Sequence, residues 1–332
     1  MQELNPENIK ASDIINSILK NAKFKETALE IFKFQKTYNS EYARWLNLLG
    51  SIDQNPQNLV DIPFLPISLF KHHKISCYPD HELCFESSST TGKGISKHYI
   101  HRKEIYEKSF ISAFSYFYNE YWDFVGALLP SYLDRSNSGL VYMVNSLIPQ
   151  IADSGEFFNK DYSTLVNVIE NKKINKQKVL LFGVTFGLLE LAKISGNRNW
   201  EHLTVIETGG MKGHGEEMVR EDVHDELKTV WNLDYIHSEY GMTELTSQAY
   251  SLKDGIFYSP PWMQILIQDP GDPSSFLPYG KTGRVCVIDL MNFHSCSFIA
   301  TDDLGKLYED GSFEILGRLD YSDIRGCNQL LQ

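Results

Sequence analysis

Apolar residues recur at helical spacing in the first part of the chain. Near the start, Ile14, Ile15, Ile18 and Leu19 would lie on one face of a helix. A helix rich in aromatic residues is expected further on, and its aromatics are more typical of core than of ligand contacts. Three stretches show this pattern and are predicted to be helical: Ile9–Thr37, Tyr42–Leu49 and Lys103–Tyr121.

Three later stretches are apolar throughout, which is typical of strands buried on both faces. They are Phe124–Leu129, Val179–Gly183 and Leu203–Glu207, and a helix is expected over Leu188–Lys193 after the second. Strands that alternate with helices predict an α/β fold with a largely parallel sheet. Ligands bind such sheets in the loops at the carboxyl ends of the strands. Two Gly-containing segments fall at such ends, Thr208–Gly213 and Ser238–Glu244.

The pattern changes after Trp262. Two predicted strands, Trp262–Gln268 and Arg284–Asp289, have no helix between them, and Lys306–Leu316 predicts a hairpin with a two-residue turn at Asp310-Gly311. An antiparallel or barrel-like subdomain is therefore predicted at about 256–318.

Composition excludes several classes of protein. The 332 residues carry a net charge of −12, whereas a nucleic-acid-binding surface needs a basic face. The first residues lack the basic and apolar blocks of a signal peptide, and the longest apolar run, Val179–Leu189, is too short to span a bilayer. The five cysteines show no zinc-like or disulfide-like spacing, which favours a reducing compartment. These features predict a cytoplasmic protein without a membrane span.

A hydroxyl-rich loop, Glu86–Lys97, precedes a short predicted strand at His98–His101. Side-chain hydroxyls and the free N–H groups of a Gly-containing loop suit a phosphate, although an ordinary surface loop has the same composition. The loop is not a Walker A motif, because Ser87 stands where the first glycine is required and Gly94 follows Lys93. The candidate phosphate contacts are Ser88, Ser89, Thr90, Thr91 and Gly92.

The loop resembles the Ser/Thr/Gly-rich loop of the adenylate-forming enzymes, and four further segments resemble that superfamily's motifs in the same order. In the second, His237–Leu245, the resemblance implies that Tyr240 contacts adenine and that Gly241 belongs to the nucleotide-binding residues. It also implies that Thr243 contacts the α-phosphate and that Glu244 binds Mg²⁺. An aromatic face suits a base, and a carboxylate suits a hard cation that also bridges phosphates. A capped helix N-terminus would give a similar segment.

The remaining motifs imply ribose and adenine contacts. In Ile299–Gly305, Asp303 takes the place of the ribose-binding carboxylate. Arg318 would meet the ribose or a phosphate, and the small residues Gly209 and Gly210 would wall the adenine. The chain departs from the superfamily pattern at Ser89 and Asp302, which replace glycines. Lys97 has the wrong offset for the usual loop lysine, so no catalytic role is assigned to it.

Three segments narrow the resemblance to the acyl-protein synthetases, the fatty-acid–protein ligases of the bacterial fatty-acid reductase complex. They are Glu207–Gly213, Glu217–Arg220 and Asp323–Asn328. The resemblance implies one large domain over 1–318, no small C-terminal lysine-bearing domain, and a short tail over 319–332. It also implies that Cys327 accepts the acyl group and hands it to a partner reductase. Arg325 would favour the thiolate modestly, and a tail cysteine without a role is the competing interpretation.

Three hypotheses follow. In the first, ATP and Mg²⁺ activate a carboxylic acid, expected to be a fatty acid, as acyl-AMP, and Cys327 takes the acyl group as a thioester for an acyl-CoA reductase-like partner. In the second, the acyl group passes to coenzyme A or to an amine. In the third, the altered loop leaves a nucleotide-binding scaffold without catalysis.

Overall fold

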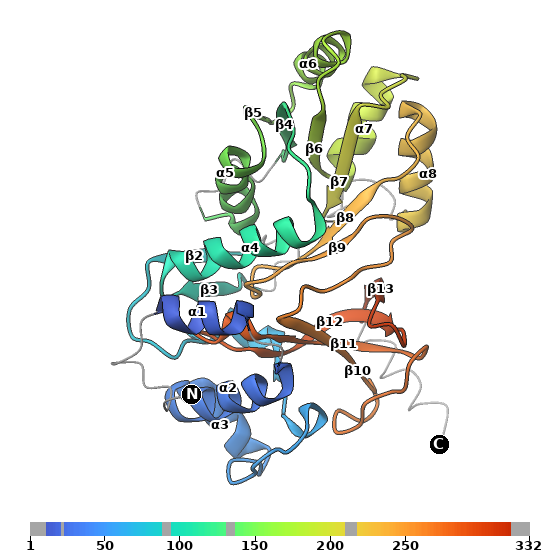
Figure 1. Ribbon diagram of the computed structural model, residues 1–332. Coiled ribbons are helices and arrows are strands. Elements are labelled where there is room, and N and C mark those ends of the chain that lie inside the picture. Colours follow the sequence, from blue (N-terminus) through green and yellow to red (C-terminus); the bar gives the residue numbers. More distant parts are fainter. Residues whose placement is uncertain (1–10, 21–22, 88–93, 131–136, 210–217, 320–332) are drawn as a thin grey trace.

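The computed structural model describes residues 11–20, 23–87, 94–130, 137–209 and 218–319. Two lobes, each built on a β-sheet, lie one above the other in Figure 1. The upper lobe holds a six-stranded sheet, and the lower lobe holds a five-stranded sheet with the N-terminal helices against it.

The upper sheet is largely parallel, as the alternating strands and helices predict. Its strand order is β5-β4-β6-β7-β8-β9, and only the β8–β9 pair is antiparallel. The strands are β4 (Phe124–Leu128), β5 (Gly155–Phe158), β6 (Val179–Val184), β7 (Leu203–Thr208), β8 (His237–Tyr240) and β9 (Ala249–Ser251).

Alternate residues of the central strands enter two separate cores, which explains their uninterrupted apolar sequences. In β6, Val179 and Leu181 face one cluster, and Leu180 and Phe182 face the other. Side chains of a strand alternate between faces, so a strand covered on both sides must be apolar at every position. The helices α7 and α8 cover one face, and α4 and α5 cover the other (Figure 1).

The lower sheet is mainly antiparallel. Its order is β1-β12-β11-β10, with β13 also paired to β12. The strands are β1 (Leu65–Pro66), β10 (Met263–Gln268), β11 (Thr282–Asp289), β12 (Phe298–Leu307) and β13 (Phe313–Arg318). A separate hairpin pairs β2 (Leu83–Glu86) with β3 (Lys97–Ile100) across the hydroxyl-rich loop.

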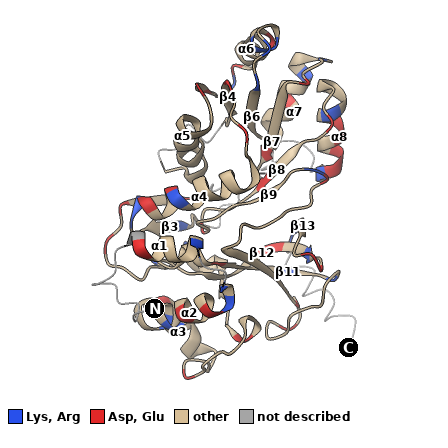
Figure 2. Cartoon of the chain, viewed as in Figure 1, with Lys and Arg blue, Asp and Glu red and all other residues tan. Residues whose placement is uncertain are grey.

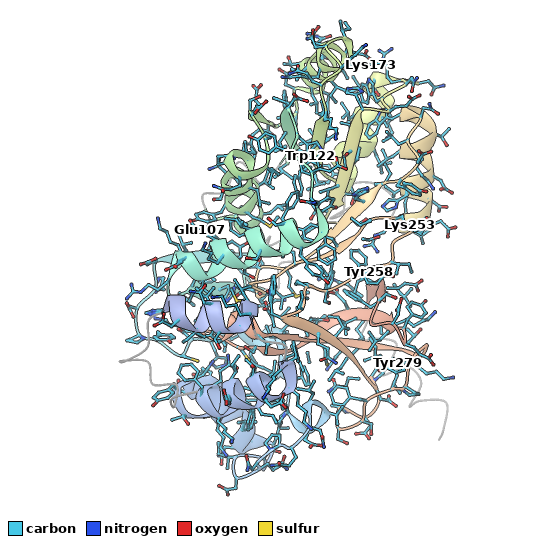
Figure 3. The ribbon with its side chains drawn as sticks, in the orientation of Figure 1. Glu107, Trp122, Lys173, Lys253, Tyr258 and Tyr279 are labelled. Carbon is cyan, nitrogen blue, oxygen red and sulfur yellow. The ribbon has the colours of Figure 1, made fainter. Side chains whose placement is uncertain are left out.

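The described α-helices range from 9 to 15 residues. They are α1 (Ala11–Lys20), α2 (Phe24–Tyr38), α3 (Ser40–Leu48), α4 (Lys103–Phe117), α5 (Gly139–Ile151), α6 (Tyr162–Ile174), α7 (Thr185–Ser195) and α8 (Arg220–Trp231). Trp122, labelled in Figure 3, is buried beyond the end of α4, where its ring meets Phe114.

Three predicted elements need correction. The helix predicted over Ile9–Thr37 is two helices, because Lys23 has non-helical dihedrals just before α2. The helix predicted to Tyr121 ends at Phe117, since the next residue, Tyr118, is extended. The predicted two-residue turn is longer: residues 308–312 connect β12 and β13, and Asp310 Oδ1 accepts from the Ser312 N–H and hydroxyl at 3.0 and 2.6 Å.

Charged side chains of both signs are spread over the two lobes (Figure 2). No helix among the described residues combines the length and the apolar character that crossing a membrane requires.

Candidate functional site

The predicted adenine and ribose contacts lie together where the two lobes meet. The Tyr240 hydroxyl, at the end of β8 in the upper sheet, donates to Asp303 Oδ2 of the lower sheet at 2.9 Å. Arg318 is opposite Asp303 in the β12–β13 register, and its Nε lies 3.6 Å from Asp303 Oδ1. Three residues predicted from separate motifs therefore form one chain of polar contacts between the lobes.

The Asp303 carboxyl group and the Tyr240 hydroxyl, which belong to this chain of contacts, lie in a low-dielectric environment. Burial raises the pKa of Asp303, and the Arg318 charge and the Tyr240 hydrogen bond oppose that rise. Tyr240 is held edge-on by Phe257 and Phe313, with centroids 6.0 and 5.8 Å away. The Arg318 side chain is 82% exposed, so it is free to meet an anionic ligand.

The segment after Tyr240 is fixed through its backbone carbonyls. Nδ1 of His98, in β3, lies 2.8 Å from the Thr243 carbonyl oxygen, and the Asn292 amide donates to the Glu244 carbonyl at 2.8 Å. The same two side chains meet each other at 3.0 Å through His98 Nε2 and Asn292 Oδ1. Residues far apart in the sequence thus hold Thr243 and Glu244, which the resemblance assigns to phosphate and Mg²⁺.

The Glu244 carboxyl group is buried and close to the end of the hydroxyl-rich loop. Burial raises its pKa, while hydrogen bonding from Ser96 and the charges of Arg318 and Lys71 act in the opposite direction. Ser87 closes the base of the loop, because its N–H donates to the Ser96 carbonyl at 3.0 Å and its hydroxyl accepts from the Ser96 N–H at 2.9 Å. The first two motifs of the resemblance therefore meet at Glu244.

The fit of Glu244 to Mg²⁺ follows from its surroundings. Within the described ranges, no three His, Cys, Asp or Glu side chains gather closely enough to hold a metal ion by themselves. Mg²⁺ at a nucleotide takes one or two carboxylates and fills its other positions with phosphate oxygens and water. A single buried carboxylate fits that pattern, and a bound cation would favour its charged form.

Two of the glycines predicted to contact the nucleotide, Gly209 and Gly241, lie in the described part of the chain. Gly209 follows β7 with φ +78°, a conformation that other residues rarely adopt. At Gly241 an added Cβ would lie 2.3 Å from Glu239 Oε1, so the Glu239 side chain would have to shift to admit any other residue. Gly210 lies outside the described residues, as do Ser88, Ser89, Thr90, Thr91, Gly92 and Cys327.

Lys97, which carries no predicted role, is paired across the β2–β3 hairpin. Its Nζ lies 3.0 Å from Glu86 Oε1.

A buried carboxylate network at the end of β7 was not singled out as a site from the sequence. The Thr185 hydroxyl donates to Glu207, and the Ser238 hydroxyl donates to Glu207 Oε2 at 3.2 Å. Burial raises the pKa of Glu207, but hydrogen bonding from His224 and the Arg220 charge outweigh it and leave the pKa below its usual value. In the sequence, the signal that could have identified this network is a charged residue near the end of an otherwise apolar strand.

Known enzymes share the fold of this chain. It matches the 2-hydroxyisobutyryl-CoA ligase in complex with 2-HIB-AMP and CoA, with a TM-score of 0.67 and 14% identity over 96% of this chain and 75% of that one. It also matches ATP-bound MatB from Rhodopseudomonas palustris, with a TM-score of 0.55 and 19% identity over 71% of this chain. The match covers 47% of MatB. The fold is that of the adenylate-forming enzymes, as the motifs predicted.

A curated relative is similar over nearly the whole chain. The long-chain-fatty-acid–luciferin-component ligase of Aliivibrio fischeri is 22% identical over 325 residues, 90% of this chain and 85% of that protein. No family model matches the chain. The resemblance drawn from the motifs is confirmed by these similarities.

Proposed function

We propose that this protein is an adenylate-forming ligase that activates a carboxylic acid, a fatty acid in the simplest case, with ATP. The contact of Tyr240, Asp303 and Arg318 across the two lobes carries the proposal. Its similarity to the fatty-acid ligase of Aliivibrio fischeri supports an acid substrate, and the fold shared with ATP-bound MatB supports ATP.

In the first step a carboxylate oxygen attacks the α-phosphorus of ATP, and the bond to pyrophosphate breaks. Tyr240 contacts the adenine, Asp303 accepts hydrogen bonds from the ribose hydroxyls, and Arg318 meets the ribose or a phosphate. Thr243 donates to the α-phosphate, and Glu244 would hold Mg²⁺, which would supply positive charge to offset that of the phosphates. The protein contributes mostly alignment and charge stabilisation, which is what attack at phosphorus requires.

In the second step the Cys327 thiolate attacks the acyl carbon, and AMP leaves. A mixed anhydride reacts readily with a thiolate. The product is a thioester that a partner acyl reductase can accept. Coenzyme A is the competing acceptor, and a protein that binds ATP without any turnover is the competing function.

The first step is tested by ATP–pyrophosphate exchange with straight-chain acids of graded length. We expect exchange that depends on the acid and on Mg²⁺. Calorimetric binding of ATP without exchange for any acid would leave a nucleotide-binding scaffold instead. Release of acyl-CoA when coenzyme A is supplied, with no label on the protein, would favour the competing acceptor.

A further inference from the structure

A group of polar side chains faces away from the proposed nucleotide site. Glu239 and Tyr250 are opposite each other in the antiparallel β8–β9 pair, so their side chains share one face of the sheet. Gln248 lies two residues before Tyr250 and therefore points to the same face. Tyr240, adjacent to Glu239, points to the other face and meets Asp303.

Two of these side chains are buried with polar atoms that have no partner. Among the described residues, the hydroxyl of Tyr250 and Oε1 of Gln248 find no hydrogen-bond partner, although the two residues are only 0% and 3% exposed. Buried polar groups are normally paired, so these two atoms are available to a polar group of a bound molecule. Glu239 beside them is partly exposed, so the cluster lies close to the protein surface.

The neighbouring polar groups are already paired. The Tyr106 hydroxyl, from α4, donates to the Gly139 carbonyl at 3.3 Å, and the Tyr118 hydroxyl lies 3.1 Å from Nδ1 of His237. The Thr208 hydroxyl donates to Glu239 Oε2. Phe114 and Phe117 pack on the Tyr250 ring, with centroids 6.0 and 5.4 Å away. Next to Glu239, the orphaned atoms on this face are therefore the Tyr250 hydroxyl and Gln248 Oε1.

The charge at this cluster is weak at neutral pH. Burial raises the pKa of Glu239 to about 7; the Thr208 hydrogen bond opposes the rise, and the Glu207 charge adds to it. The tyrosines that face it stay neutral, because burial and the Glu239 charge raise the pKa of Tyr106, Tyr118 and Tyr250. Burial also lowers the pKa of His237 to about 4, so this ring is neutral as well.

The proposed function decides which reactant meets the cluster. If the nucleotide occupies the Tyr240 face, the acid must approach the α-phosphate from the other side of the strand end, where Glu239, Gln248 and Tyr250 lie. We infer that these three residues bind a hydroxyl group carried by the acid near its carboxylate. The inference rests on the proposed function and narrows its substrate to hydroxy acids.

A hydroxyl fits this cluster better than the alternatives. It donates to Glu239 or Gln248 and accepts from the Tyr250 hydroxyl, so it satisfies the orphaned atoms together. A plain alkyl chain would leave them buried and unpaired. An ammonium group would need a full negative charge beside it. The Glu239 carboxyl group titrates near neutral pH and therefore carries only part of a negative charge.

The test compares ATP–pyrophosphate exchange for matched acids: a straight-chain acid, its 2-hydroxy and 3-hydroxy analogues, and its 2-amino analogue. A site built to hydrogen-bond a hydroxyl discriminates strongly against the analogue that lacks it. We expect kcat/KM to favour one hydroxy acid over the plain acid by at least about 10-fold. In Tyr250→Phe and Glu239→Gln this ratio should fall several-fold toward one.

A tyrosine in the lower lobe provides a matched control. Tyr279 is 59% exposed and lies on the loop between β10 and β11, well separated from α4 in Figure 3. Tyr279→Phe should leave both the rates and the ratio unchanged. The ratio is informative because a loss of folded protein lowers both rates together and does not change it.

The outcomes separate the inference from the proposed function. Equal kcat/KM for plain and hydroxylated acids, or a ratio that neither substitution changes, would overturn the inference while leaving the ligase intact. Preference for the amino analogue would replace the hydroxyl by an ammonium group and would also overturn it. Absence of exchange with every acid contradicts the proposed function and the inference with it.

Discussion

Buried carboxyl groups are the residues on which the proposed chemistry depends. Asp303, Glu244 and Glu239 come from different elements, and burial raises the pKa of each. A charged group in such a place gains more from a cation or a hydrogen-bond donor than it would in water. Each of them is therefore a candidate ligand contact that a substitution can test.

Glu244→Gln tests the metal contact at nearly constant size. Because the metal offsets phosphate charge in the transition state, we expect pyrophosphate exchange to fall by at least about 100-fold, with the fold retained. Exchange rate against Mg²⁺ concentration is the measurement, and circular dichroism checks the fold. The control is Glu314→Gln, a partly exposed residue of β13 whose carboxylate lies 3.9 Å from Lys306 Nζ. Near-normal exchange at saturating Mg²⁺ would remove Glu244 from the metal site.

The raised pKa of Glu239 predicts that the stability of the protein depends on pH. Its pKa is about 7 in the folded protein against an ordinary 4.5, so the unfolded chain ionises first as pH rises. The stability contributed by the protonated group is complete below about pH 4.5 and is lost as pH rises to about 7. A shift of this size corresponds to about 3 kcal/mol.

Glu239→Gln removes this titration. We expect the free energy of unfolding of the variant, relative to the original protein, to rise by up to about 3 kcal/mol between pH 5 and pH 8. Urea denaturation at both pH values measures the difference. A difference that does not change with pH would show that Glu239 titrates normally.

Sequence motifs could find only some of these residues. Tyr240, Asp303 and Arg318 belong to segments with a recognisable order, and the structure brings them into contact. Glu239 is adjacent to Tyr240, but its partners, Tyr250 and Thr208, lie on other strands. The register between the strands brings these residues together, and no local sequence pattern predicts that register.

At the scale of elements, the site depends on the β2–β3 hairpin and on the connection between β11 and β12. His98 enters from β3 and Asn292 from that connection, and both are fully buried. Asn292 also accepts from the Thr246 hydroxyl at 3.1 Å, while Asp289 accepts from the Thr246 N–H at 2.9 Å. The lower lobe thereby fixes the backbone that presents Glu244.

Asn292→Ala should weaken this connection. It leaves the Glu244 carbonyl and the Thr246 hydroxyl buried without their partner, and each such group costs about 1–3 kcal/mol. We expect a loss of about 2–4 kcal/mol in the free energy of unfolding and a fall in exchange rate at saturating ATP. Urea denaturation and exchange kinetics measure the two effects.

Asn199→Ala is the matched control, because Asn199 is exposed and its side-chain oxygen accepts a hydrogen bond from the Asn232 amide at 3.1 Å. A comparable loss in both variants would mean that Asn292 has no special place in the site.

The elements predicted from apolar runs agree with the structure. β6 spans Val179–Val184 and β7 spans Leu203–Thr208, within one residue of the prediction. No prediction was made for α5 or α8. Helix α5 contains Pro149, a residue that normally argues against a helix interior. Helix α8 begins at Arg220, carries Glu221 and Asp222 in its first turn and has only one apolar face, a weaker signal than a continuous apolar run.

At the scale of the whole molecule, the proposed site lies where the two sheets meet. The sequence predicted one largely parallel sheet and one antiparallel sheet, but not that β1, near residue 65, pairs in parallel with β12. This long-range pairing joins the N-terminal region to the strand that carries Asp303. Secondary-structure propensity and hydrophobic periodicity are local properties of the sequence, so they cannot reveal a pairing between distant strands.

The burial of the four described cysteines indicates whether any of them could accept the acyl group. Cys77, Cys286 and Cys296 are buried, and Cys84 is half-buried. Burial raises the pKa of all four thiols, that of Cys296 to about 12. The thiolate is the nucleophile, so none of the four is suited to attack acyl-AMP. Cys327 lies outside the described residues and remains the proposed acceptor.

Cys327→Ser separates the two half-reactions. A hydroxyl is a far poorer nucleophile than a thiolate at neutral pH, so labelling of the protein by fatty acid and ATP should largely disappear. Pyrophosphate exchange should stay nearly unchanged, since acyl-AMP formation does not use the thiol. The matched control is Cys84→Ser, which should keep a label that hydroxylamine removes. Denaturing gels with and without hydroxylamine measure the label on each variant. Full labelling of Cys327→Ser would exclude this thiol as the acceptor and leave coenzyme A or an amine as the destination of the acyl group.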